Sequence, residues 1–383
     1  MTRLDRAVNI EDLRRSAKSR LPRSVFDFFD GGAEEESTLR GNAEAFRRLR
    51  LLPKVLVDVH MVDTSVELLG ARSSLPMAIA PTGAIGAGRP GAEMMLARAA
   101  RAAGIPFTLA TPATASIEEV AEASAGGRLW FQLYLLKNVD FRMKLVARAK
   151  AAGYEALVVT VDLATGGKRE RDLRNDFSAP FRPNWRNSRD IPFKPAWLLD
   201  IARHGIPRMK NLEGMVTNAP RLTDIAASVG RELDASFDWD DLKRLRDAWP
   251  GKLVLKGIVR PDDAERAAAA GCDAVVVSNH GGRQLEGAIA TLDALPAVAR
   301  AAGSRLAVLV DGGVRRGVDL LKARALGAQG VLTGRATLFG VMAGGDAGAK
   351  RAIEILAGEL ERAMMLCGVA RAADIGADLA VRP

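Results

Sequence analysis

Short apolar runs alternate with alanine-rich helical stretches along most of the chain. Eight runs have the length and composition of buried strands, and they begin near Leu75, Ile105, Arg128, Ala156, Lys252, Ala274, Arg305 and Gly330. These runs are almost continuously apolar, as expected of strands that are buried on both faces of a parallel sheet. Stretches between them, such as 92–103 and 264–270, have helical periodicity. The pattern predicts an α/β fold, a (β/α)8 TIM barrel.

The spacing of the runs predicts one long insertion. Consecutive runs start 22 to 31 residues apart, except that the fifth starts 96 residues after the fourth. We expect a single domain over 1–383, in which 75–162 and 241–345 form the barrel and 163–240 are an insertion after strand 4. Residues 1–74 are expected to form an N-terminal helical extension. Its first helix is marked by Ile10, Leu13 and Leu21 and stopped by Pro22, a second precedes Gly31, and a less regular segment follows. Residues 346–383 are expected to form a C-terminal helix and tail.

Polar residues follow the apolar runs where each predicted strand ends. In a TIM barrel these ends meet at one rim, which carries the active site. The clearest case is VVVSNHGGRQL, where three valines are followed by Ser278, a titratable base at His280, two glycines and the cation Arg283. The other strand ends carry Pro81, Thr82 and Gly83; Thr111; Gln132 and Tyr134; Thr160 and Asp162; Lys256; Asp311 and Gly313; Gly334 and Arg335. Polarity at every strand end is hard to assign to core packing, so it indicates function.

The last two strand-end loops predict a phosphate-bearing cofactor such as a flavin. Barrels often bind phosphate with the loops after strands 7 and 8, which here contain Gly313 with Arg315 and Gly334 with Arg335. Lys256, at the end of strand 5, is either a Schiff-base lysine or a fixed cation. A site that already has two arginines and a histidine needs no imine, which favours the fixed cation.

Composition narrows the class of protein. The 48% hydrophobic content supports a large core, and two cysteines are too few for a disulfide framework. We find no signal-peptide pattern and no apolar segment of roughly 20 residues, so we expect a cytoplasmic protein that does not cross a bilayer. The net charge of +9 is compatible with nucleic acid, an anionic membrane surface or an anionic substrate, and does not choose among them. No metal site is expected.

The insertion has two parts of different character. Residues 166–172 are glycine-led and charged, and are expected to form a lid over the barrel mouth. Residues 181–210 mix cations with aromatic and aliphatic side chains, as in Phe181, Arg182, Trp185, Arg186, Arg189, Phe193, Lys194, Trp197, Leu198, Leu199, Arg203, Arg208 and Lys210. The same stretch contains only two acidic residues, Asp190 and Asp200, to balance these cations. The mixture suits an anionic membrane surface, and a solvated loop or an oligomer contact fits it equally well.

Several motifs together resemble one family. They are SNHGGRQL from Ser278, IAPTG from Ile79, FQLY from Phe131, LKGI from Leu255, LTGRA from Leu332, TVD from Thr160 and RERD from Arg169. The chain resembles, over nearly its whole length, the FMN-dependent L-2-hydroxy-acid dehydrogenase/oxidase family. Its insertion is most similar to that of the membrane-associated, quinone-linked mandelate and lactate dehydrogenases.

The resemblance implies a role for each residue at the rim. His280 would take a proton from the substrate, from either the α-carbon or the hydroxyl, and Asp162 would stabilise its imidazolium form. Arg283 and Arg169 would bind the substrate carboxylate, and Tyr134 the hydroxyl or nascent carbonyl oxygen. FMN would be bound by Pro81, Thr82, Gly83, Thr111, Gln132, Thr160, Lys256, Ser278, Asp311, Gly313, Arg315, Gly334 and Arg335.

Two positions depart from the family pattern. Phe26 stands where a tyrosine usually helps to bind the carboxylate, so one hydrogen bond to a charged group, worth about 1.5 to 3 kcal/mol, is expected to be missing. Ala110 replaces a common flavin-contacting serine and favours an aromatic acid such as mandelate. Gly83, an alanine in many oxidases, favours the dehydrogenase branch.

The expected function is therefore FMN-dependent oxidation of a mandelate- or lactate-type acid, with electrons passed to a quinone. The partners implied are a small 2-hydroxy acid, the quinone, the cytoplasmic face of the inner membrane and three further copies in a homotetramer, with no nucleic acid. The alternative within the family is an oxidase that reduces oxygen to hydrogen peroxide. The alternative of another class is a barrel that only binds a phosphate ligand or nucleic acid, which would not require a histidine, an aspartate, a tyrosine and two arginines at one rim.

Overall fold

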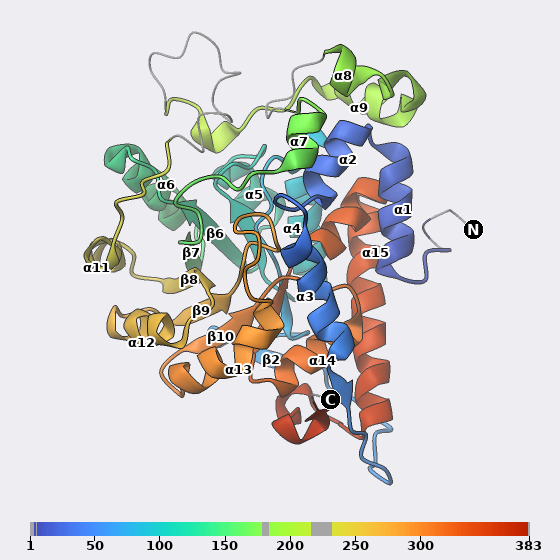
Figure 1. The fold of residues 1–383 in the computed structure, drawn as a ribbon, viewed down its shortest axis with the longest axis vertical. Helices are drawn as coiled ribbons and strands as arrows, with labels where there is room; N and C mark the ends of the chain where they lie inside the picture. The colour runs from blue at the N-terminus through green and yellow to red at the C-terminus, as the bar shows by residue number, and fades with distance from the viewer. Residues whose placement is uncertain (1–3, 5, 178–183, 216–231, 382–383) are drawn as a thin grey trace.

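A closed barrel of eight parallel strands is the centre of the molecule in the computed structural model, which describes residues 4, 6–177, 184–215 and 232–381 (Figure 1). The strands follow one another around the barrel in chain order, and the last, β11, pairs with the first, β4. They are β4 Met77–Ile79, β5 Phe107–Ala110, β6 Leu129–Tyr134, β7 Ala156–Thr160, β8 Lys252–Ile258, β9 Ala274–Val277, β10 Ala307–Val310 and β11 Gly330–Thr333. Each coincides with one of the eight apolar runs, which confirms the predicted TIM barrel.

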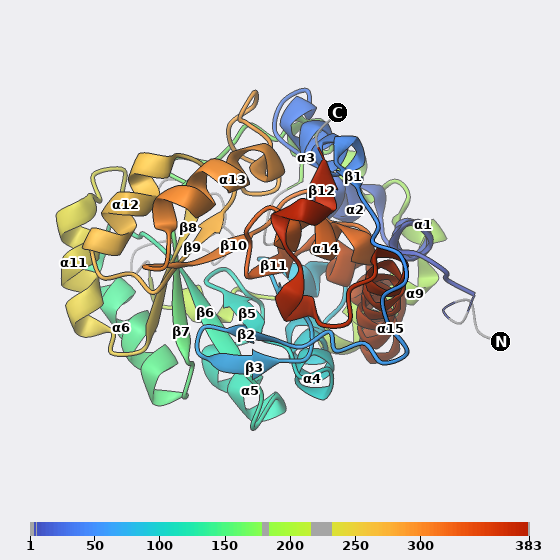
Figure 2. The same ribbon diagram turned by 90° about the horizontal axis from the view of Figure 1, so that it is seen from below.

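Helices surround the barrel, as Figure 2 shows from below. They are α4 Ala92–Ala102, α5 Ile117–Ala123, α6 Val139–Ala151, α11 Trp239–Ala248, α12 Pro261–Ala269, α13 Thr291–Ala302, α14 Gly317–Ala325 and α15 Arg335–Cys367. Local sequence sets several of their starts: Ser116 and Asp238 begin α5 and α11 with capping boxes. Because the helices cover the outside, the strand residues are buried, and all five residues of β7 are.

The N-terminal extension contains three helices, α1 Ile10–Arg20, α2 Arg23–Asp30 and α3 Ser37–Arg48. The first two coincide with the expected helices, whereas α3 lies in the segment expected to be irregular. Its buried face includes Thr38 and Asn42, so its apolar periodicity is weak, and Glu36 begins it without a side-chain cap. Two small sheets follow: β2 Val66–Leu68 pairs with β3 Ala71–Ser73, and β1 Arg50–Leu51 pairs with β12 Ala380–Val381.

The insertion contains short helices, α7 Glu170–Arg174, α8 Trp185–Ser188 and α9 Pro195–His204, together with the 3-10 turns η2 Ile191–Phe193 and η3 Lys210–Leu212. Figure 1 shows α7, α8 and α9 at one end of the molecule, beside α1 and α2. Phe181 and Arg182 lie outside the described residues. Trp197 is buried and its indole N–H donates to the Ala87 carbonyl at 2.8 Å, so α9 is docked on the loop after β4.

The C-terminal helix α15 is bent at Gly344 and Gly345, where Gly345 has a φ of +61°. The bend coincides with the expected end of the barrel at residue 345. Beyond it, α15 packs beside α1 and α14. No helix within the described ranges is both long and apolar enough to pass through a membrane.

Candidate active site

A cavity of about 310 Å³ lies among the carboxyl ends of the barrel strands. The structure brings most of the predicted site residues to its lining. These are Pro81, Thr82, Gly83, Gln132, Tyr134, Thr160, Arg169, Lys256, His280, Arg283, Asp311, Gly313, Arg315, Gly334 and Arg335.

Thr111 and Ser278 lie behind the lining and hold it in place. The Thr111 hydroxyl donates to the Gln132 carbonyl at 2.6 Å and accepts the Tyr134 backbone N–H at 3.0 Å. The Ser278 hydroxyl accepts a hydrogen bond from Lys256 Nζ at 2.8 Å. Both residues therefore position side chains that face the cavity.

His280 and Asp162 form a hydrogen-bonded pair at the cavity wall. Nδ1 of His280 lies 2.9 Å from Asp162 Oδ1, and the left-handed backbone of His280, with φ +58°, turns the residue off the end of β9. Burial opposes the charge of Asp162, but His280 and Lys256 outweigh it and lower the pKa of this carboxyl. Because Asp162 occupies Nδ1, Nε2 is the nitrogen left to exchange a proton with a ligand.

Lys256 is a fixed cation in this geometry. Its Nζ lies 3.1 Å from Asp311 Oδ2, and the side chain is buried. Burial opposes its charge, but Asp311 and Asp162 outweigh it and raise the pKa of Lys256. A Schiff-base lysine needs a neutral amine, so the structure favours the second of the two alternatives for this residue.

Among the described residues, four arginines line the cavity, Arg169, Arg283, Arg315 and Arg335, and Asp311 is the one acidic residue in the same lining. Burial and then Arg169 lower the pKa of Arg283 to about 10. Burial, Arg283 and Arg315 lower the pKa of Arg335 well below its ordinary value, and burial lowers that of Arg315. Guanidinium groups that repel one another in a buried site are suited to an anionic ligand, such as a phosphate or a carboxylate.

Backbone carbonyls hold two of these arginines in place. Nη1 of Arg283 donates to the carbonyls of Phe28 at 2.8 Å and Gly31 at 2.9 Å. Arg335 donates to the carbonyls of Phe29, Gly31 and Gly281. The end of α2 thus orients both cations, and partial negative charge at a helix C-terminus stabilises them.

The donor set fits the flavin expected from the sequence. Gly313, with φ +89°, lies so close to Asn42 that an added Cβ would be 2.4 Å from the Asn42 carbonyl oxygen, so only glycine allows this backbone path beside Arg315. Asp311 Oδ1 is buried and has no hydrogen-bond partner among the described residues, so it can accept a hydroxyl of a bound ligand. No cluster of metal-ligating side chains occurs in the described part of the chain.

The prediction for Phe26 needs correction. Its ring is buried against Phe339, with ring centres 6.2 Å apart, and it does not line the cavity. Phe28 does, with Arg169 and Arg283 centred 5.4 and 5.3 Å from its ring. Residues two apart on a helix point to nearly opposite sides, so α2 cannot present both. The helical spacing of Val25, Phe26 and Phe29 marks the core face and could have identified Phe28.

Sequence reasoning also missed an apolar part of the wall. Leu163, Met209 and Leu233 line the cavity, together with Ala110. Leu233 is held beside the end of β6, because the Lys137 N–H donates to Glu232 and the Asp234 N–H donates to Leu135, at 2.8 and 2.7 Å. The sequence around Leu233 does not identify it as a cavity residue, because the segment with which it pairs lies about a hundred residues earlier in the chain.

Comparisons with known proteins agree with this geometry. A family model described as FMN-dependent dehydrogenase matches residues 17–382. The chain is 42% identical to (S)-mandelate dehydrogenase of Pseudomonas putida over 94% of this chain and 90% of that one. It is 44% identical to an L-lactate dehydrogenase of Caulobacter vibrioides over 95% of both chains. A crystal structure titled monotopic membrane protein (S)-mandelate dehydrogenase superposes with a TM-score of 0.94 at 41% identity, over 99% of this chain and 100% of that one.

Proposed function

We infer the reaction from the fact that the chain belongs to the FMN-dependent dehydrogenase family and is therefore an FMN-dependent oxidoreductase. We propose that it oxidises an L-2-hydroxy acid of the mandelate or lactate type to the 2-oxo acid. The observation that carries the proposal is that His280, paired with Asp162 behind it, lines one cavity with Arg169 and Arg283. A base and two guanidinium groups match the hydroxyl-bearing carbon and the carboxylate of such an acid.

Each side chain binds a different group of the substrate. Arg169 and Arg283 bind its carboxylate, and the buried Tyr134 hydroxyl binds its hydroxyl oxygen. Nε2 of His280 accepts the proton that leaves, from the α-carbon or from the hydroxyl. Because Asp162 stays ionised, it stabilises the imidazolium that this transfer creates.

The remaining polar residues would hold FMN, which accepts the two electrons. Arg315, Arg335 and the backbone at Gly313 would bind its phosphate, and Asp311 a ribityl hydroxyl. Lys256 would place its charge at the edge of the ring system, where reduction increases negative charge. Pro81, Thr82, Gly83, Gln132, Thr160 and Gly334 would complete the lining around the ring and phosphate.

The apolar wall favours a substrate with a bulky apolar substituent. Once carboxylate and hydroxyl are bound, the third substituent of the α-carbon is left to meet Leu163, Met209 and Leu233. Burial of apolar surface stabilises by about 25 cal/mol per Å², so a phenyl group gains more there than a methyl group. We therefore expect mandelate to be preferred over lactate.

We also propose that the protein lies on the cytoplasmic face of the inner membrane and passes electrons to a quinone. Trp185 and Phe193 of the insertion have 75% and 79% of their surface exposed, and Leu198, Leu199 and Ile206 are exposed nearby. Cations such as Arg186 and Arg203 accompany them. This combination suits an anionic bilayer surface, and a relative of known structure is titled a monotopic membrane protein. A homotetramer remains the expectation from the family.

Anaerobic flavin reduction tests the function. The purified protein should be yellow and should bleach with (S)-mandelate or L-lactate, and mandelate should show the higher kcat/KM. In His280→Ala, FMN should remain bound while the rate of bleaching falls by a factor on the order of 10² to 10⁴, because the proton acceptor is gone. A colourless protein that does not take up FMN, or bleaching at the wild-type rate in His280→Ala, would contradict the proposal. Stoichiometric hydrogen peroxide during aerobic turnover would favour the oxidase alternative.

A further inference from the structure

We propose that Arg171 is a positioning residue: by binding an acidic cluster on the N-terminal extension, it holds lid helix α7 so that Arg169 reaches the substrate carboxylate. The acidic cluster consists of Asp27, Asp30 and Glu36. The proposal rests on the proposed function, because it assumes that Arg169 binds a carboxylate.

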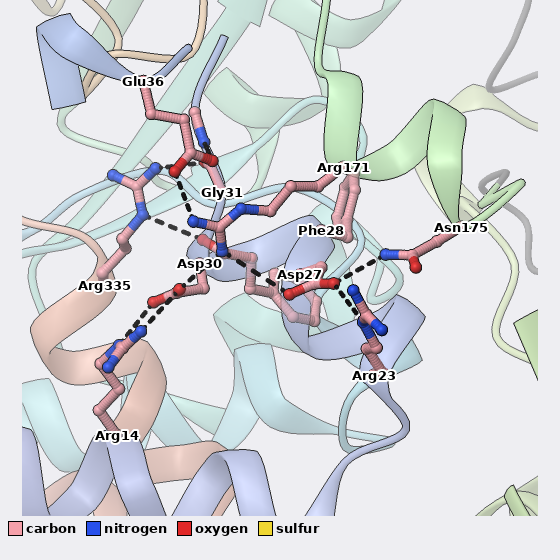
Figure 3. A network of polar contacts seen from close by, with 12 residues as sticks. Arg14, Arg23, Asp27, Phe28, Asp30, Gly31, Glu36, Arg171, Asn175 and Arg335 are labelled. Carbon is pink, nitrogen blue, oxygen red and sulfur yellow. Dashed lines mark hydrogen bonds and ion pairs between the residues drawn. The ribbon is translucent and has the colours of Figure 1, made fainter. Parts of the chain in front are cut away.

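Arg171 contacts every member of the acidic cluster, as Figure 3 shows. Its Nη1 lies 3.1 Å from Asp30 Oδ2 and 3.6 Å from Asp27 Oδ1, and its Nη2 donates to Glu36. The three carboxylates belong to α2 and to the turn after it, whereas Arg171 belongs to the insertion. A single guanidinium therefore joins two segments that are far apart in sequence.

The helix that carries Arg171 depends on such contacts. α7 has only five residues, too few to be stable alone. Arg169 is the residue immediately before it and has no side-chain cap hydrogen bond there. Its other contacts are to Asp172 on α7, which lies 3.2 Å from its Nε, and to Phe28 on α2, over whose ring its guanidinium lies. The place of Arg169 in the cavity therefore follows from where α7 is docked.

Two further contacts tie the same helix to α2. Asn175 Nδ2 donates to Asp27 Oδ2 at 2.8 Å, and Phe177 stacks on Phe28 with ring centres 4.8 Å apart. These act at the C-terminal side of α7. At its N-terminal side the Lys168 carbonyl accepts the Glu34 backbone N–H at 2.8 Å, which fixes the main chain, while Arg171 is the side chain that ties the first turn to the acidic cluster. We therefore expect Arg171 to decide the fine position of the Arg169 side chain and the other contacts to keep the segment docked.

The acidic cluster also reaches the other arginines of the cavity. Burial opposes the charge of Asp30, but Arg14, Arg335 and Arg171 outweigh it and lower the pKa of this carboxyl. Gly31, the residue after Asp30, accepts hydrogen bonds from both Arg283 and Arg335. α2 is thus a common support for the two substrate arginines, since it holds Arg283 through carbonyls and Arg169 through Arg171.

The alternative is a surface ion pair of little consequence, as exposed pairs are worth about 0 to 1 kcal/mol. The burial of the partners argues against it. The side chains of Asp30 and Glu36 are only 9% and 13% exposed, and that of Arg171 is 34% exposed. Loss of Arg171 would remove one of the cations that balance the acidic cluster. Carboxylates left without a counter-charge are costly in a partly buried site.

The test compares Arg171→Ala with Arg174→Ala on the same helix. Arg174 is 72% exposed and pairs only with Glu170 among the residues described, so it is a matched control. In Arg171→Ala we expect KM for the hydroxy acid to rise roughly tenfold, equivalent to about 1.4 kcal/mol, with FMN content unchanged and kcat changed less. Arg171→Lys should recover part of the loss, because an ammonium group can reach one carboxylate but not three.

The outcomes separate this proposal from the function itself. Failure of any 2-hydroxy acid to reduce the wild-type flavin would remove the proposed function. The positioning role alone would be overturned if the wild-type flavin is reduced normally but KM is unchanged in Arg171→Ala. It would also be overturned if KM rises equally in Arg174→Ala. If Arg171→Ala yields no folded protein, Glu36→Gln decides: a KM increase with normal FMN content supports the role, and an unchanged KM overturns it.

Discussion

Phe26 and Phe28 are two residues apart on α2, yet they contact different parts of the molecule. Phe26 packs against Phe339 in the core, and the Phe28 ring contacts the guanidinium groups of Arg169 and Arg283 at the cavity. A phenyl ring beside two guanidinium groups offers cation–π attraction but no hydrogen bond to a bound carboxylate. Substitutions at the two positions should therefore have different effects.

We predict that Phe28→Tyr lowers KM for the hydroxy acid, whereas Phe26→Tyr lowers stability. At Phe28 a phenolic O–H can donate to the carboxylate, and a hydrogen bond to a charged group is worth about 1.5 to 3 kcal/mol, so KM should fall by roughly tenfold or more. Phe26 is buried against Phe339, so an added hydroxyl would have to be desolvated in the core, and we expect a cost of about 1 to 3 kcal/mol. Steady-state kinetics and thermal unfolding measure the two effects. A lower KM in Phe26→Tyr with no change for Phe28→Tyr would contradict the assignment.

Among the helices and strands, those of the barrel could be predicted from the sequence. The segments around the barrel could be predicted only in part. The strands are buried on both faces, so each leaves a continuous apolar run. Counting along these runs places Thr160 at the end of β7 and Lys256 two residues before the end of β8. α3 buries Thr38 and Asn42 and leaves no such pattern. Leu233 reaches the cavity through pairing with residues 135–137, which no local pattern encodes. Phe26 was expected at the cavity because two phenylalanines lie two residues apart, and only the apolar face of α2 distinguishes the buried one from the one at the cavity.

The insertion combines docked and exposed aromatic residues, so the membrane role proposed for it can be tested without deleting it. Trp197 is buried and should be left in place, while Trp185 and Phe193 are exposed. We predict that Trp185→Ser with Phe193→Ser reduces binding to anionic lipid vesicles at least tenfold, because about 25 cal/mol is lost per Å² of apolar surface that would enter the bilayer. FMN content and anaerobic reduction should be unchanged.

Val55→Ser is the matched control for the vesicle experiment. Val55 is also exposed, at 79%, but belongs to the segment after β1 and not to the insertion. It should bind vesicles like the wild type. Equal binding of the double variant and the wild type would remove the insertion from the membrane contact.

At the scale of the whole molecule, cofactor binding and stability are coupled through charge. Arg283, Arg315 and Arg335 converge on one cavity, where burial and then the charges of Arg283 and Arg315 lower the pKa of Arg335. A ligand that binds only the folded state stabilises it, by about 2.7 kcal/mol at a hundred times its Kd. An anion at the phosphate position removes repulsion as well.

We predict that removal of FMN lowers the melting temperature by several degrees, since 1 kcal/mol shifts Tm by about 2 to 4 °C in domains of 150–250 residues and less in a larger one. Inorganic phosphate should restore part of this loss in the apoprotein, and sodium chloride at equal ionic strength should restore less. In Arg335→Gln the phosphate effect should shrink. An apoprotein as stable as the holoprotein, with no response to phosphate, would contradict the coupling.

The hydrogen bonds from Arg335 to Phe29 and Gly31 join positions 306 and 304 residues apart, and β11 closes the barrel against β4. Such contacts close very long loops in the chain. During synthesis, α2 leaves the ribosome long before the arginine it orients. The proposed phosphate site therefore lacks Arg335 until the last strand of the barrel has been translated, so we expect FMN to bind only after that point.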